Sequence, residues 1–194
     1  MIFNSIQSER YDVCLINPFR NAKTNIKNRS GLYVRLFIDD FCGCGEAAPL
    51  SPYSNETLAE ISWAFEELKI ALKDNSHYLK DDLLDLFELY ARDMPSLHFA
   101  LDISLYDIMA QKEKISLAKY LNFNNLNEVK FSSVYNGAIN KSFKKVKVKF
   151  GLNDIDKEIN FLYELFNQYN NKVQFRIDAN QAYSIDEFLY LLNE

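Results

Sequence analysis

The chain of 194 residues is long enough for one large or two small domains, each with a hydrophobic core. Apolar residues make up 48% of the sequence, and 22 basic residues stand against 27 acidic ones, which gives a net charge of −5. This composition excludes an intrinsically disordered chain and argues against a general nucleic-acid-binding protein, while leaving room for a local basic patch.

Targeting signals and disulfide patterns are both missing from the sequence. No apolar run approaches the ~20 residues that a membrane span needs, and residues 1–6 lack the basic and apolar regions of a secretion signal. Three cysteines, an odd number, fit reduced cytosolic thiols better than a disulfide framework. We therefore predict a cytoplasmic protein that has neither a membrane nor a nucleic acid as its partner.

The first 48 residues are predicted to form strands, at residues 10–16, 32–38 and 41–46. Between the first two strands, residues 17–30 are predicted to be an irregular polar segment. Asp39 and Asp40 are predicted to form the tight turn between the last two strands. The chain is thus expected to begin with a small sheet.

Residues 54–112 have the hydrophobic spacing of three helices. Ser54 is the predicted N-cap of the first helix, and Pro95 opens the third. The residues that recur at steps of three and four are Leu58, Ile61, Phe65, Leu68 and Leu72, then Leu83, Leu86, Phe87 and Tyr90, then Leu97, Leu101, Leu105, Ile108 and Met109. We expect these three apolar stripes to pack together in an α+β module.

After a polar linker predicted at residues 122–128, strands alternate with helices. The predicted strands are residues 130–135, 145–149 and 173–180. A helix with Asn153 as its N-cap separates the last two strands, and its apolar residues are Ile155, Ile159, Leu162 and Phe166. A further helix begins at Ser184. A strand, a crossover helix and a second strand make a parallel βαβ unit.

Both strands of this βαβ unit have one polar and one apolar face. The pleat places Lys145, Lys147 and Lys149 opposite Val146, Val148 and Phe150, and it places Gln174, Arg176 and Asp178 opposite Val173, Phe175 and Ile177. In an open doubly wound sheet, helices cover both faces and both are apolar. An ionic face instead predicts helices on the outside only, as in the wall of a barrel that surrounds a polar pocket.

Two other interpretations of the lysines follow from the residues alone. Alternate lysines often mark a solvated sheet face, although exposed faces are rare in parallel sheets. Five lysines between positions 141 and 149, with Phe143 among them, could form a nucleic-acid surface. The acidic total and the alternation of the strand argue against that surface.

The charged residues at the ends of the two strands suit a specific chemistry. Lys149 and Asp178 lie at the carboxyl ends of their strands, where barrel enzymes place the active site. A lysine can act as a base when desolvation and neighbouring cations disfavour its charged form, and Lys147 lies one pleat period away. The carboxylate of Asp178 offers the hard oxygen ligand that Mg²⁺ prefers, and a complete metal site needs further carboxylates.

Four stretches of the sequence resemble the enolase superfamily and, within it, the o-succinylbenzoate synthases of menaquinone biosynthesis. They are residues 29–34 with 43–50, residues 54–58, residues 94–102, and the pair Lys147-Val148-Lys149-Phe150-Gly151 and Arg176-Ile177-Asp178-Ala179-Asn180. The first three resemble the capping sheet and helices of that family. The last pair resembles the Lys-x-Lys and Asp-Ala-Asn signatures of the second and third barrel strands.

The resemblance implies an α+β capping domain at residues 1–122 and an incomplete (β/α)₈ barrel, with its first three strands only, at residues 123–194. Residues 17–30 and 49–54 would be the capping loops that close over the substrate. Because a complete barrel takes about 250 residues, we expect this chain to be the N-terminal portion of an enzyme and inactive alone.

The resemblance also assigns roles to individual residues. Lys149 would be the general base, Lys147 its electrostatic partner and Asp178 a ligand of the Mg²⁺ cofactor, while Arg176 and Asn180 would bind a small-molecule carboxylate substrate. The implied reaction is that of a hydro-lyase. It removes the proton α to a carboxylate, giving an enediolate held by Mg²⁺, and then expels hydroxide to form o-succinylbenzoate.

Other functions fit the same residues. Where many such synthases have Pro-Gly-Phe-Ser, this chain has Ser51-Pro52-Tyr53-Ser54. A dipeptide epimerase or a cycloisomerase would share the base and the metal but differ in the capping loops. A third alternative is a non-catalytic polypeptide that keeps the capping fold for binding or assembly.

Overall fold

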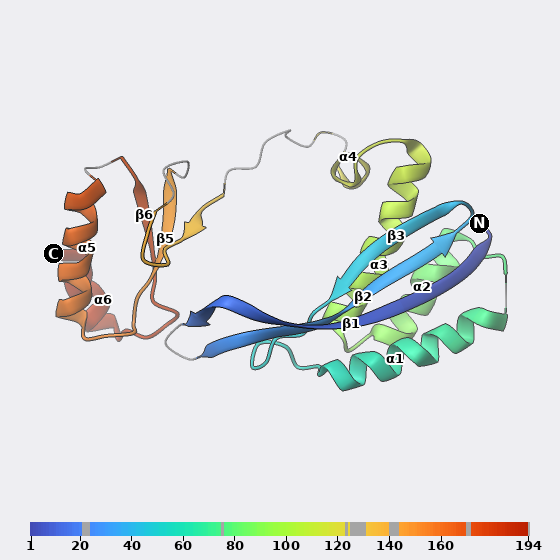
Figure 1. Ribbon diagram of the computed structural model, residues 1–194, viewed down its shortest axis with the longest axis horizontal. Coiled ribbons are helices and arrows are strands. Elements are labelled where there is room, and N and C mark those ends of the chain that lie inside the picture. The colour runs from blue at the N-terminus through green and yellow to red at the C-terminus, as the bar shows by residue number, and fades with distance from the viewer. Residues whose placement is uncertain are drawn as a thin grey trace. The chain divides into compact units, whose positions relative to one another are not determined.

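The computed structural model describes residues 1–20, 24–74, 76–122, 124, 131–139, 144–169 and 172–193. By their contacts, these residues divide into two compact units (Figure 1). The first unit comprises Met1–Cys14 and Asn28–Leu126, and the second comprises Leu15–Lys27 and Asn127–Glu194. The tip of the first hairpin therefore groups with the second unit, and a domain boundary between residues 122 and 123 stays a prediction.

The first unit contains an antiparallel sheet in the order β1-β2-β3. Its strands are β1 (Phe3–Arg20), β2 (Asn25–Ile38) and β3 (Phe41–Ala47). The predicted turn at Asp39 and Asp40 is confirmed, and Asp39 adopts a φ of 51° there. β3 pairs with β2 from Leu32 to Ile38, so among the described residues the remaining part of β2, residues 25–31, has only β1 beside it.

The prediction of an irregular segment at residues 17–30 was wrong. β1 continues to Arg20 and β2 begins at Asn25, so most of this segment is strand. Many of its side chains are exposed, which explains the error. Where neither face of a strand packs against a core, the sequence lacks the apolar alternation that identifies a strand.

Four helices follow the sheet, and the three long ones lie against one face of it (Figure 1). They are α1 (Leu58–Ala71), extended by the 3₁₀ turn Leu72–Asp74, then α2 (Lys80–Ala91), α3 (Pro95–Glu113) and the short α4 (Leu117–Leu121). Pro95 opens α3 as predicted. The predicted N-cap of α1 was wrong: Thr57 caps the helix in a capping box with Glu60, and the Ser54 hydroxyl accepts the Leu50 N–H.

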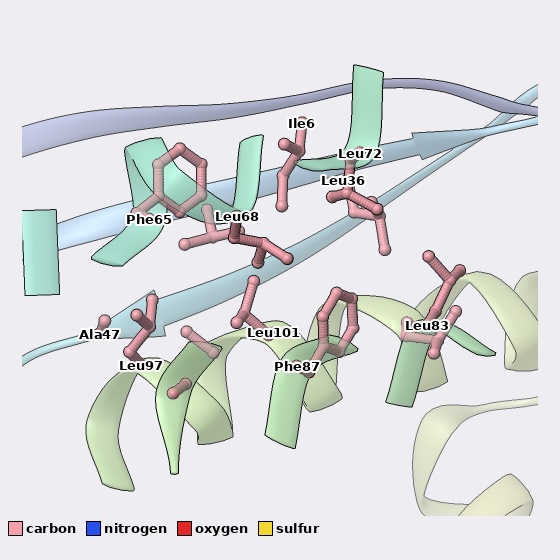
Figure 2. Close-up of a cluster of buried hydrophobic side chains, with 14 of the residues drawn as sticks. Ile6, Leu36, Ala47, Phe65, Leu68, Leu72, Leu83, Phe87, Leu97 and Leu101 are labelled. Atoms are coloured by element: carbon pink, nitrogen blue, oxygen red, sulfur yellow. The ribbon is translucent and has the colours of Figure 1, made fainter. Parts of the chain in front are cut away.

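The predicted apolar stripes form the core between these helices and the sheet (Figure 2). Most of their members are fully buried, whereas Leu58, Leu86 and Tyr90 pack at the edge and Met109 is half-buried. β2 contributes alternate residues to the same core. These are Leu32, Val34, Leu36 and Ile38, each at most 4% exposed. The alternate residues of β2 and the periodic apolar residues of the helices thus form one buried layer.

Two glycines let α3 approach β3 at backbone distance. A Cβ atom at Gly43 would lie 1.8 Å from the carbonyl oxygen of Ser104, and one at Gly45 would lie 2.0 Å from that of Ala100. Both distances are far below van der Waals contact, so only glycine fits at these positions. The pair fixes α3 on the sheet.

The second unit contains a parallel sheet in the order β4-β5-β6. Its strands are β4 (Ser133–Val134), β5 (Lys145–Lys149) and β6 (Gln174–Asp178). Helix α5 (Ile155–Tyr169) connects β5 to β6, and α6 (Ile185–Asn193) follows β6. Figure 1 shows α5 and α6 on the same side of β5 and β6. The predicted fold class, an α+β capping domain followed by the first three strands of a (β/α)₈ barrel, is confirmed.

The pleat of β5 was predicted correctly. Val146, Val148 and Phe150 are each 1% exposed and pack with Leu165 of α5, while the lysines lie on the opposite face. The predicted N-cap Asn153 was wrong by one residue. α5 begins at residue 155, and the carboxylate of Asp154 accepts the N–H of Asp156.

Several predictions concern residues outside the described ranges. Most of the linker at residues 122–128 and the first residue of the strand at 130–135 fall there. So do Lys141 and Phe143 of the lysine-rich run. Across the described ranges, no helix combines the length and the apolar character needed to cross a membrane.

Candidate active site

Two lysines of β5 converge on one carboxylate of β6. The parallel register pairs Lys149 with Asp178, and it pairs Lys147 with the neighbouring Arg176. The Nζ atoms of Lys147 and Lys149 both lie 2.5 Å from Oδ2 of Asp178. The sequence predicted this convergence from the strand alternation, and the structure confirms the geometry. The catalytic and metal-binding roles of the three residues stay predictions.

The convergence is partly sheltered from solvent. The exposed fraction of the side chain is 13% for Lys149, 30% for Lys147 and 22% for Asp178. Ion pairs in such surroundings are screened less than pairs in open solvent. The ammonium groups of Lys147 and Lys149, with the N–H of Asn180, therefore hold the pKa of Asp178 well below its ordinary value of 3.8, although burial acts in the opposite direction.

Asn180 and Arg176, the predicted substrate-binding residues, occupy different surroundings. The amide oxygen of Asn180 accepts a hydrogen bond of 3.0 Å from Nζ of Lys149, and its backbone N–H donates to Oδ1 of Asp178 at 3.2 Å. Asn180 has a φ of 49°, which asparagine tolerates better than most residues. Arg176 lies on the same face of β6 with an exposed side chain. Asn180 thus belongs to the lysine cluster, and Arg176 lies beside it.

A pocket of about 540 Å³ borders Lys149 within the second unit. The hairpin residues 17–19 line one part of it, and Tyr135, Phe150 and Phe161 line others. The ring of Phe19 lies 5.4 Å from Nζ of Lys149, within the range of a cation–π contact. The hairpin tip therefore supplies an apolar wall beside the amine. Sequence reasoning missed Phe19 because it treated the segment as irregular.

Within the first unit, side-chain hydrogen bonds hold the base of the same hairpin to the end of β3 and the residues after it. The hydroxyl of Tyr11 donates a 2.5 Å hydrogen bond to Oε1 of Glu46. Burial and this bond raise the pKa of Tyr11 to about 12. The guanidinium of Arg29 donates to the carbonyl oxygens of Ala48 and Pro49. These contacts join β1 and β2 to the end of β3 and to the start of the predicted capping loop at residues 49–54.

The residues at the cluster fit one part of a magnesium site. Asp178 offers two carboxylate oxygens: Oδ2 accepts both amines, with which a metal ion would compete, and Oδ1 accepts the N–H of Asn180. Magnesium prefers such oxygens and is commonly held by one or two carboxylates. Within the described part of the chain, no three residues among His, Cys, Asp and Glu are grouped as metal ligands. Asp178 can therefore be one ligand of a site that needs others.

Sequence reasoning also missed Glu158, which lines the same pocket as Lys149, and Tyr183, which is bonded to Glu158. Glu158 is 3% exposed, and the hydroxyl of Tyr183 donates a hydrogen bond to its carboxylate. Burial and this bond raise the pKa of Tyr183 above its ordinary value of 10.0. Glu158 lies on the buried side of α5 with Ile159 and Leu165. Hydrophobic periodicity considers apolar residues only, so a buried glutamate leaves no signal in it.

The pKa shift of Asp178 predicts how stability depends on pH. Because the folded state lowers this pKa, Asp178 stabilises the fold above pH 3.8, and this contribution is lost as the pH falls below that value. We expect Asp178→Asn to lower the free energy of unfolding at pH 7 by about 2 kcal/mol, since two amines lose their charged partner. Urea unfolding followed by circular dichroism at pH 7, 5 and 3 measures the difference between variant and parent.

The difference should shrink toward pH 3, where the parent begins to lose the same interaction. Asp186→Asn, which changes an exposed carboxyl group on α6, is the matched control and should show little effect at any pH. A destabilisation by Asp178→Asn that is equal at pH 7 and pH 3 would contradict the prediction.

Comparison with known proteins gives one family match. Residues 8–108 match the family model described as "MenC, N-terminal domain". The match covers the strands and helices of the first unit from β1 to most of α3. It extends over more than half of the chain.

Curated relatives and a solved structure extend over nearly the whole chain. An L-Ala-D/L-Glu epimerase of Francisella tularensis subsp. novicida is 27% identical over 97% of this chain and 56% of its own length. The enzyme of the same name from Bacillus subtilis is 27% identical over 92% of this chain and 52% of its own length. The crystal structure of a dipeptide epimerase from Enterococcus faecalis V583, complexed with Mg and L-Leu-L-Tyr, superposes with a TM-score of 0.82 at 20% identity.

The superposition includes 100% of this chain and 58% of the chain in that structure. At such an identity, the likeness concerns the fold. The chain spans about half the length of the curated relatives that it matches.

Proposed function

This chain belongs to the MenC N-terminal domain family, and with it to the enolase superfamily, and from this premise we propose that it is part of an enzyme that removes the proton α to a carboxylate. The single observation that carries the proposal is the position of Lys149. Its side chain is 13% exposed at the carboxyl end of a parallel strand, and its amine lies beside a second amine and a carboxylate. That end of the strand is where barrel enzymes bind their substrates.

Each residue of the cluster has a role in this proposal. In its neutral form, the amine of Lys149 accepts the α proton at Nζ and becomes an ammonium group. Lys147 supplies positive charge near the negative charge that develops on the substrate, while Asn180 holds the Lys149 amine in place through its amide oxygen. In comparable sites, the loss of one pre-organised donor costs about 3–4 kcal/mol of transition-state stabilisation.

Asp178 would hold a Mg²⁺ ion together with ligands from other strands. A bound Mg²⁺ neutralises the substrate carboxylate and so makes the α proton more acidic. Arg176, exposed on the same face of β6 as Asp178, would contact a carboxylate of the substrate. The substrate class is therefore a small carboxylate, with the hairpin tip and Phe19 as the apolar side of its binding site.

The first candidate reaction is o-succinylbenzoate synthesis, which the MenC family match supports. The substrate is 2-succinyl-6-hydroxy-2,4-cyclohexadiene-1-carboxylate. The proton on its carboxylate-bearing carbon passes to Lys149, the C–O bond on the adjacent carbon breaks, and the hydroxide leaves as water after protonation. The ring becomes aromatic, so this enzyme would be a hydro-lyase.

The second candidate is dipeptide epimerisation, which the curated relatives favour. The first step is the same removal of an α proton. A second acid on the opposite side then adds a proton to the other face of the carbon, so the carbon is inverted and no group leaves. Such an enzyme would be an isomerase.

Incubation of the complete enzyme in D₂O with Mg²⁺ separates the two candidates. A synthase would consume the cyclohexadiene and leave L-Ala-L-Glu free of deuterium at its α carbons. An epimerase would incorporate deuterium into the dipeptide and invert that carbon, without acting on the cyclohexadiene. If neither compound reacts, the result counts against both candidates and favours a non-catalytic role.

A further inference from the structure

Glu158 of α5 is a charged residue that the fold buries. Its exposed fraction is 3%, although it is a charged residue in the first turn of α5, where Asp156 and Lys157 are exposed. Helical side chains point toward the N-terminus of their helix, so that of Glu158 points back toward the loop between β5 and α5. A buried carboxylate is unfavourable unless its oxygens accept hydrogen bonds.

The two oxygens of Glu158 accept four hydrogen bonds. Oε1 accepts the backbone N–H groups of Leu152 at 2.9 Å and Asn153 at 3.1 Å. Oε2 accepts the N–H of Gly151 at 2.9 Å and the hydroxyl of Tyr183. Three of the donors are consecutive amides that begin two residues after Lys149. The fourth comes from the loop between β6 and α6, which follows Asp178.

Two further contacts join these loops. The backbone N–H of Phe150 donates to the carbonyl oxygen of Asp178 at 3.0 Å. Gly151 has a φ of 78°, and a Cβ atom there would lie 2.2 Å from the Cβ of Ala182, so the loops touch at a point that admits no side chain. The ends of β5 and β6 are therefore connected at three successive places.

We propose that Glu158 is a positioning residue that, through Tyr183, couples the loop after Lys149 to the loop after Asp178 and so sets the spacing of the two side chains. The contribution of Glu158 to catalysis rests on the proposed function. The coupling itself is a property of the fold. In oriented active sites, a displacement of about 1 Å can lower the rate by about 100-fold.

Two variants separate the coupling from a local effect on one loop. Glu158→Gln weakens the bonds to all four donors, whereas Tyr183→Phe removes one hydroxyl and leaves the three amide bonds to Glu158 in place. Glu164→Gln is the matched control, because Glu164 is an exposed glutamate on the same helix. Amide hydrogen exchange of the full chain, measured by NMR, reports on each site.

In Glu158→Gln, we expect the amides of Leu152 and Asn153 to exchange at least about tenfold faster than in the parent protein. The amide of Phe150, which bridges the two strand ends, should also exchange faster. In Tyr183→Phe, we expect faster exchange at Phe150 with Leu152 and Asn153 nearly unchanged. Glu164→Gln should leave all three amides unchanged.

The proposal is overturned if Phe150 keeps its protection in Tyr183→Phe, because Glu158 would then organise one loop only. That outcome remains measurable even if Glu158→Gln fails to fold. In the complete enzyme, Glu158→Gln should lower kcat by about 100-fold with a much smaller change in KM. Absence of activity in the parent enzyme would refute the proposed function, and the exchange rates would still test the coupling.

Discussion

Lys149→Ala is expected to lower the turnover of the complete enzyme by about 10²- to 10⁴-fold, the range that general base catalysis contributes. The amine of Lys149 is the least exposed cation of the cluster and would be the group that accepts the substrate proton. Asp178 keeps Lys147 as a partner in the variant, so the fold should hold. Steady-state kinetics, with the substrate that the D₂O experiment identifies, measure the turnover. Urea unfolding measures the stability of the fold.

Lys145→Ala is the control for this substitution. Lys145 lies on the same strand and the same face as Lys149, but it is exposed at the opposite end of the strand. Its removal should leave turnover within about twofold of the parent, as expected for a surface change away from the site. Retained turnover in Lys149→Ala would remove this lysine from the mechanism.

Asp178→Asn is expected to raise the dissociation constant of the complete enzyme for Mg²⁺ by about 10- to 100-fold. Magnesium depends on charged oxygen ligands, and even changes to residues that only support a ligand weaken metal binding by that factor. Isothermal titration with Mg²⁺ in the absence of substrate gives the affinity directly, so this test does not depend on activity.

Asp186→Asn serves as the control, because it removes an exposed carboxylate from α6 without touching the cluster. Its affinity for Mg²⁺ should equal that of the parent. Equal affinity in Asp178→Asn as well would exclude Asp178 as a metal ligand.

The sequence was most informative where a residue pattern has one structural solution. Strict alternation from Lys145 to Phe150 can put the lysines on one face only, and the parallel context brings Lys149 beside Asp178. The helical stripes were equally direct, because spacings of three and four bury one side of a helix. These patterns were sufficient to predict the lysine cluster and the core of the first unit.

Features that depend on backbone approach or on buried polar groups escaped prediction. Gly43 faces α3 at a distance that only the folded backbone defines. Glu158 can be buried because three backbone amides and a hydroxyl donate hydrogen bonds to it. No residue pattern in the sequence predicts that these donors lie together. Residues 17–30 of the hairpin were predicted to be irregular because many of their side chains face solvent. The hydrophobic pattern of such a segment does not distinguish a strand from a loop.

The partial pairing of β2 has a mechanical consequence. In the part of the chain that the structure describes, residues 25–31 of β2 pair with β1 alone, as a two-stranded ribbon, and isolated ribbons need a third strand for independent stability. Tyr11, bonded to Glu46, and Arg29, bonded to the start of the next loop, clamp the root of this ribbon. The second unit supplies the missing support, because Leu15–Lys27 groups with it and the ring of Phe19 lies beside the amine of Lys149 there.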